Sequence, residues 1–68
     1  MKIKIINGST TSSMEFTEED VFNGMIEAID NILEKEVGTI KYHSKNPKTQ
    51  TIIFTSKYLI NSLIEITQ

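Results

Sequence analysis

The strongest structural pattern in the chain lies in residues 17–38. Placed at steps of about 100°, the apolar side chains of this stretch fall within one arc of roughly 140°. They are Val21, Phe22, Met25, Ile26, Ile29, Ile32 and Leu33. Thr17 can cap the first turn, and Gly38 can close the last turn. The pattern predicts a long amphipathic helix, and the rest of the chain must supply a surface that covers its apolar stripe.

An alternating pattern before this helix predicts the first strand of that surface. Residues 1–6 alternate Lys and Ile, as a half-buried strand does. Asn7 and Gly8 follow, and this dipeptide is a strong hairpin signal. Residues 9–16 then form either the returning strand of a hairpin or a plain loop, and the sequence leaves both alternatives open.

A second hairpin is predicted after the helix. Residues 39–43 alternate again, and residues 49–55 are rich in β-branched and aromatic side chains. Asn46 and Pro47 lie between them and favour a turn. The strand side chains that we expect to face the core are Ile3, Ile5, Ile40, Tyr42, Ile52 and Phe54.

The end of the chain, residues 57–66, supports two interpretations. Ser56 can cap a helix there. The residues with helical spacing are Leu59, Ile60, Leu63 and Ile64. The alternation of Ile64, Glu65 and Ile66 instead predicts a strand. We favour the helix, and the strand stays open as the alternative.

Together these elements predict one domain, residues 1–68, of the α+β class. We expect a two-layer β(β)αββα fold, in which an antiparallel or mixed sheet carries the long amphipathic helix and a short C-terminal helix on one face. A chain of 68 residues buries only about 60% of its unfolded surface, so its stability is marginal. Without cysteines it has no disulfides, and we therefore expect a homo-oligomer.

Patterns that carry catalytic or metal chemistry are absent from the sequence. It contains no phosphate loop, no dinucleotide fingerprint, no paired-histidine motif and no calcium-loop spacing. It has no cysteine and a single histidine, which excludes thiolate sites and histidine clusters for zinc. We therefore expect no enzyme activity, no metal and no cofactor.

Charge is divided unevenly along the chain. Eight of the nine acidic residues lie between Glu15 and Glu36, and the net charge is −2. The predicted helix carries an acidic stripe opposite its apolar arc, formed by Asp20, Glu27, Asp30 and Glu34. Like charges at helical spacing each cost a few tenths of a kcal/mol. The stripe is either a solvated face or a surface that meets a basic partner.

The predicted sheet offers a basic surface. If all strands share one sheet, its open face carries lysines and exposed isoleucines, and the turn adds two more lysines. These residues are Lys2, Lys4, Ile6, Lys41, His43, Ile53, Lys45 and Lys48. Apolar patches rimmed by charge often mark interaction sites. We therefore expect this surface to bind a partner.

The expected function is that of a small non-catalytic protein-binding module that regulates or inhibits another macromolecule. One alternative is nucleic-acid binding through the lysine-rich face and hairpin turn, and another is an acidic mimic of nucleic acid. No apolar run approaches the roughly 20 residues of a membrane span, and residues 1–4 lack a signal-peptide core, so we expect a cytoplasmic protein without membrane contact. Frequent Ile, Lys, Asn and Thr suit an AT-rich genome, such as that of a phage or mobile element.

Overall fold

The elements of the fold are described for residues 1–45 and 48–68 of a computed structural model, so the turn predicted at Asn46 and Pro47 lies outside the described residues. In chain order they are β1 (Lys2–Asn7), β2 (Thr10–Glu15), α1 (Glu19–Lys35), β3 (Thr39–Ser44), β4 (Gln50–Thr55), α2 (Ser56–Ile60) and β5 (Leu63–Thr67). The paired strands are antiparallel. The predicted α+β class, with one long helix and one short helix, is confirmed.

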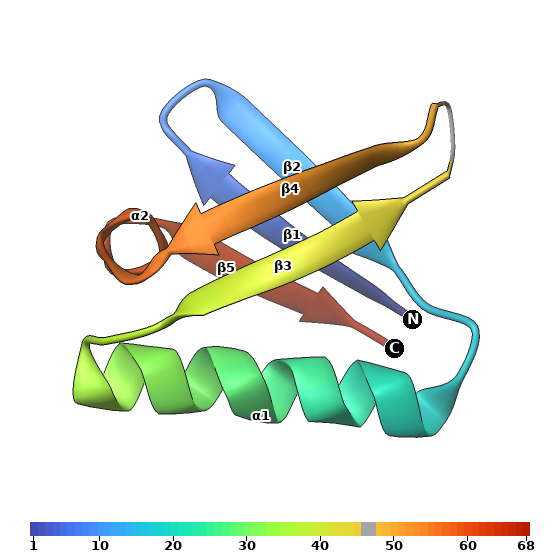
Figure 1. Cartoon of the computed structure of the whole chain (residues 1–68), viewed down its shortest axis with the longest axis horizontal. Coiled ribbons are helices and arrows are strands. Elements are labelled where there is room, and N and C mark those ends of the chain that lie inside the picture. The colour runs from blue at the N-terminus through green and yellow to red at the C-terminus, as the bar shows by residue number, and fades with distance from the viewer. Residues whose placement is uncertain (46–47) are drawn as a thin grey trace.

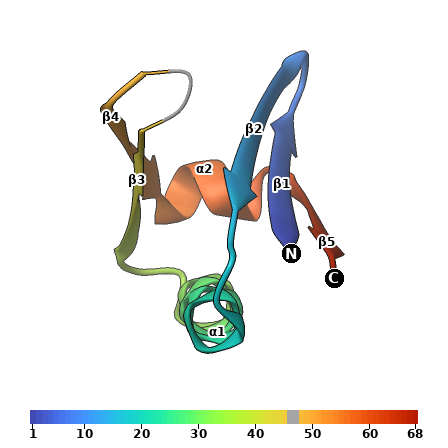
Figure 2. The same ribbon diagram turned by 90° about the vertical axis from the view of Figure 1, so that its right-hand side faces the viewer.

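The strands form two sheets rather than the single sheet that we expected. One sheet has the order β2-β1-β5, and the other pairs β3 with β4. In Figure 1 the β3–β4 sheet lies in front of the other, and its strands cross those behind it. Figure 2 shows the sheets as separate layers, with α1 along one side of both and α2 between them. Side-chain alternation in the sequence did not reveal this division. The same alternation is expected when two hairpins join edge to edge in one sheet and when they pack face to face as two sheets.

The first hairpin settles the alternative left open for residues 9–16 in favour of a strand. Asn7 pairs with Thr10, so only Gly8 and Ser9 form the turn. Gly8 has φ of 61°, which glycine adopts without the strain that a Cβ would cause. Glycine at the first central position is typical of a type II′ turn, whose twist suits a tight hairpin.

Both ends of α1 differ from the predicted ends. The N-cap residue is Glu18, whose side chain makes no capping hydrogen bond, so Thr17 does not cap the helix. At the other end Glu36 adopts a left-handed φ of 57°, and its N–H donates to the Ile32 carbonyl at 2.7 Å. The helix therefore ends before Gly38. Gly38 has φ of 116°, and a Cβ there would lie 3.2 Å from the Ile32 side chain.

The C-terminal segment contains both of the predicted alternatives in succession. Helix α2 stops at Ile60, and β5 then pairs with the second edge of β1. The expectation that the helix continues through Leu63 and Ile64 is wrong, because this pairing gives the backbone of β1 its partners on both sides. Thr55 rather than Ser56 caps α2: its hydroxyl accepts a hydrogen bond from the backbone N–H of Tyr58, at 3.2 Å.

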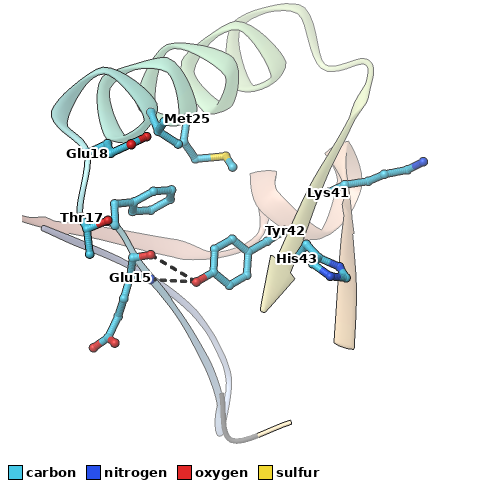
Figure 3. Close-up of a pocket in the computed structure, with 9 residues that line it drawn as sticks. Glu15, Thr17, Glu18, Met25, Lys41, Tyr42 and His43 are labelled. Atoms are coloured by element: carbon cyan, nitrogen blue, oxygen red, sulfur yellow. Dashed lines mark hydrogen bonds between the residues drawn. The ribbon is translucent and has the colours of Figure 1, made fainter. Parts of the chain in front are cut away.

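The two sheets are also joined at one point by the Tyr42 side chain (Figure 3). Its hydroxyl accepts a hydrogen bond from the backbone N–H of Glu15 at 3.1 Å and donates one to the Glu15 carbonyl at 3.3 Å. The N–H of Phe16, the next residue, donates instead to the Met1 carbonyl at 2.9 Å. Backbone groups of successive residues in a strand point in opposite directions, so the N–H and C=O of Glu15 point away from β1. Tyr42 supplies the hydrogen-bond partner that β1 does not give them.

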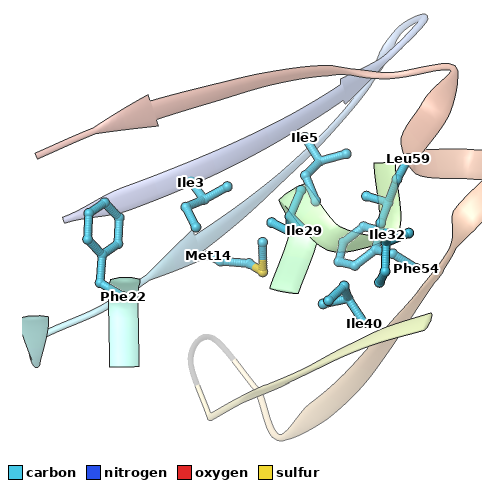
Figure 4. Packing of buried hydrophobic residues seen from close by; sticks show 9 residues of the cluster. All are labelled: Ile3, Ile5, Met14, Phe22, Ile29, Ile32, Ile40, Phe54 and Leu59. Atoms are coloured by element: carbon cyan, nitrogen blue, oxygen red, sulfur yellow. The ribbon is translucent and has the colours of Figure 1, made fainter. Parts of the chain in front are cut away.

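Among the described residues, nine buried apolar side chains form the core between the two sheets and the two helices (Figure 4). They are Ile3, Ile5, Met14, Phe22, Ile29, Ile32, Ile40, Phe54 and Leu59. The predicted inward positions of both hairpins are confirmed, with Tyr42 and Ile52 half-buried at the margin. Val21 is the exception in the helix stripe: it is 51% exposed, because it lies at the edge of the apolar arc.

Candidate functional site

The structure divides the predicted basic surface between the two sheets. The residues on β1 are Lys2, Lys4 and Ile6, whereas Lys41, His43 and Ile53 lie on β3 and β4, with Lys45 and Lys48 beside the ends of those strands. The inner faces of the sheets meet at the core, so their outer faces point in different directions (Figure 2). The two groups therefore do not share one face, and their role in binding stays a prediction.

On the outer face of the β2-β1-β5 sheet, each lysine of β1 lies beside an acid. Lys2 is opposite Glu15 of β2, and Lys4 is opposite Glu65 of β5. Cross-strand neighbours of opposite charge attract one another and compensate each other's field. This face is therefore mixed in charge rather than basic, which does not favour a surface that binds phosphates.

The outer face of the β3–β4 sheet combines one exposed apolar residue with polar neighbours. Ile53 is 55% exposed and lies opposite Lys41. His43 Nδ1 lies 2.8 Å from the Thr51 hydroxyl, so a neighbouring side chain engages the only histidine. Lys41 and His43 also line, together with Tyr42, a shallow pocket of about 350 Å³ that reaches Glu15 and the start of α1 (Figure 3). The face is a small mixed patch.

A groove lies between α1 and β5, where the sequence favoured a continuing helix. It has a volume of about 170 Å³. The residues that line it are Ile26, Ile29, Asp30, Leu33, Ile64 and Ile66, and we call it the α1–β5 groove. Five of these six are apolar, and Ile66 is 46% exposed. The strand alternation of Ile64 and Ile66 was the one sequence signal for this groove.

The acidic stripe of α1 borders the same groove. Its residues, Asp20, Glu27, Asp30 and Glu34, are all exposed, as expected from their place opposite the apolar arc. Asp30 lines the groove directly. Glu27 and Glu34 lie three residues before and four residues after it, and are thus on the same side of the helix. The groove is apolar inside and negatively charged along its helical rim.

The backbone of β5 has one free edge. Because the Met1 carbonyl accepts from Phe16, the odd-numbered residues of β1 bond to β2, and the even-numbered residues bond to β5. Their partners on β5 are Leu63, Glu65 and Thr67. Ile64 and Ile66 therefore point their N–H and C=O groups away from β1, toward the side where the described sheet has no further strand.

Apolar side chains flank this free edge on both faces of β5. Leu63, on the outer face, is 63% exposed, and Ile66 lies on the groove side. Native proteins usually protect an edge strand with charges, proline or a bulge. The one charged residue of β5 is Glu65. An edge strand with exposed apolar residues is a surface on which another chain can pair.

Other kinds of site receive no support in the described ranges. No group of acidic or histidine residues there could hold a metal ion. No helix in that part of the chain is long and apolar enough to cross a membrane. Comparisons of the chain with protein-family models, curated proteins and solved structures find no match. The α1–β5 groove and the free edge beside it combine exposed apolar side chains, a negatively charged rim and backbone groups left unpaired in the described sheet.

Proposed function

We propose that the chain is a non-catalytic protein-binding module that regulates or inhibits another macromolecule by occupying it through β5 and the α1–β5 groove. The observation that carries the proposal is the exposure of apolar side chains on both faces of a strand whose backbone edge is free. Leu63 is 63% exposed and Ile66 is 46% exposed. Apolar surface of this kind, rimmed by charge, is typical of protein interaction sites.

The distribution of lysines supports a protein partner over a nucleic acid. Lys2 and Lys4 have acidic neighbours in register, and Lys41 lies on a different sheet. A phosphate-binding surface needs several cations that act together on one face. The acidic stripe favours a second candidate function, that of an acidic mimic of nucleic acid. In that case the carboxylates of the stripe would bind the partner, and the apolar groove would not contribute.

Two matched substitutions test where the module binds. Tagged wild-type protein is used to capture proteins from a lysate of the source organism, alongside Ile66→Asp and Ile53→Asp. Both isoleucines are about half exposed, so neither change should disrupt the core. We expect Ile66→Asp to lose the captured protein, because a carboxylate in the groove is costly to desolvate, and Ile53→Asp to retain it.

Three other outcomes are informative. Loss with Ile53→Asp alone would move the binding surface to the outer face of the β3–β4 sheet. A second outcome is that both single variants retain the captured protein, while a triple variant loses it. That result would favour the acidic mimic if the triple variant combines Glu27→Gln, Asp30→Asn and Glu34→Gln. If the wild type retains no protein above an unrelated tagged control, the proposed function is wrong.

A further inference from the structure

Resting on the proposed function, we infer that the partner supplies an extended segment that alternates apolar and basic residues and adds to β5 as a new strand. The segment would pair with the backbone of Ile64 and Ile66, and would place its apolar side chains over the α1–β5 groove. Strand addition of this kind takes affinity from main-chain hydrogen bonds and specificity from alternate side chains.

The backbone of β5 sets the position of the incoming strand. Ile64 and Ile66 each present one donor and one acceptor at the free edge, as the register with β1 requires. Both side chains line the groove, so the partner residues opposite them also face the groove. The partner residue that lies opposite Glu65 faces the outer side, next to a carboxylate.

The other edge of β5 shows which pattern fits this strand. There β1 pairs its alternating Lys and Ile residues with β5: Ile3 lies opposite Ile66, and Lys4 lies opposite Glu65. Ile3 and Ile5 of β1 are fully buried by this arrangement and by the rest of the core. An incoming strand meets the same side chains of β5 from the other side, so the same alternation of apolar and basic residues matches them.

Charge around the groove strengthens the case for basic residues. Asp30 lines the groove, and Glu27 and Glu34 lie on the same side of α1. Lys35 is the only lysine of α1, and it lies about 140° around the helix from Asp30. The groove-facing residues of the new strand are apolar, so Lys or Arg at its outward positions and ends would be attracted by the field of these carboxylates, without a competing cation from α1.

The same charges argue against a second copy of the chain as the occupant. A two-fold β5–β5 pair would bring the Asp30 sides of two α1 helices together, so the acidic rims would repel each other. A pair centred on Glu65 would also place two carboxylates directly opposite, which is destabilising. The predicted homo-oligomer is therefore not the occupant that we assign to this edge.

A selection from short random peptides displayed on phage, with the full chain as the target, tests the inference. We expect the selected peptides to alternate β-branched or aromatic residues with Lys or Arg. In nuclear magnetic resonance titrations with a synthetic copy of a selected peptide, the amide signals of Ile64 and Ile66 should shift most. Without peptide, no dimer that protects the amides of Ile64 and Ile66 should be detected by light scattering combined with hydrogen exchange.

Two pairs of variants test the inference. The first pair separates the loss of a backbone hydrogen bond from the loss of the Ile66 side chain, and the second separates a charge at the groove from the net charge of the protein. Ile66→Pro should bind about tenfold more weakly than Ile66→Ala, because only the proline removes an N–H that points to the partner. Asp30→Asn should weaken binding several-fold. Glu15→Gln, which removes one charge at the opposite edge strand of the sheet, should not change it.

Equal binding by Ile66→Pro and Ile66→Ala, peptides without basic residues, or no enriched peptide would each overturn the inference. So would a dimer that protects Ile64 and Ile66. If one of these results occurs while Ile66→Asp still abolishes capture of a protein from the lysate, the protein-binding function stands. Only the proposal that the partner adds a strand with basic residues is then excluded. If capture also fails, the proposed function fails as well.

Discussion

Replacing Phe22 with alanine is expected to cost about 3–5 kcal/mol of the free energy of unfolding. The Phe22 ring is 1% exposed and projects from α1 into the core. Its centroid lies 5.6 Å from that of Phe16, whose ring lies 6.0 Å from that of Tyr42. These three rings connect the helix to both sheets, so the deletion leaves a cavity where the layers meet. A domain of this length has a total stability of only about 3–10 kcal/mol.

Urea unfolding followed by circular dichroism measures this loss. The matched control is Val21→Ala, a substitution at the neighbouring residue of α1, which is 51% exposed. We expect the control to cost less than about 1 kcal/mol, because little apolar surface is lost from the core. Similar losses for the two variants would show that α1 does not pack against the sheets through Phe22.

The second large effect is expected from a proline at Glu65. In β5 the N–H of this residue points toward Lys4 of β1, so proline removes a bond from the ladder and places its ring against the neighbouring strand. We expect Glu65→Pro to cost about 3 kcal/mol or more, comparable to a proline that breaks a hydrogen bond within a helix. The measurement is again urea unfolding.

A proline one residue further along provides the control. Ile66 points its N–H to the free edge, where proline is tolerated. Ile66→Pro should therefore cost far less than Glu65→Pro, even though it also removes a half-exposed apolar side chain. The opposite order of stabilities would show that β5 pairs with β1 through Ile64 and Ile66, and that the assigned free edge is wrong.

The sequence was sufficient for the elements whose side-chain pattern is local. The apolar arc of α1 and the inward positions Ile3, Ile5, Ile40 and Phe54 are confirmed, because helical and strand periodicities directly reflect which side is buried. The helix ends were less predictable. Glu36 terminates α1 in a conformation that glycine normally takes, and this depends on local backbone geometry rather than on the periodic pattern.

The candidate site was less predictable because it depends on which strands pair. Assigning all strands to one sheet placed Lys2 and Lys41 on a common face, whereas they lie on separate sheets. Extending the last helix through Ile64 concealed the strand that forms the groove with α1. Pairing between distant strands leaves no period in the sequence, so the groove and the free edge emerge only from the three-dimensional arrangement.

Amide hydrogen exchange of the free protein, followed residue by residue, tests the central claim most directly. That claim is that β5 offers an unpaired edge with apolar side chains on both faces. We predict slow exchange for the amides of Leu63, Glu65 and Thr67, which bond to β1, and fast exchange for those of Ile64 and Ile66. Slow exchange at all five amides would contradict the claim, because it would mean that the edge of β5 is already covered.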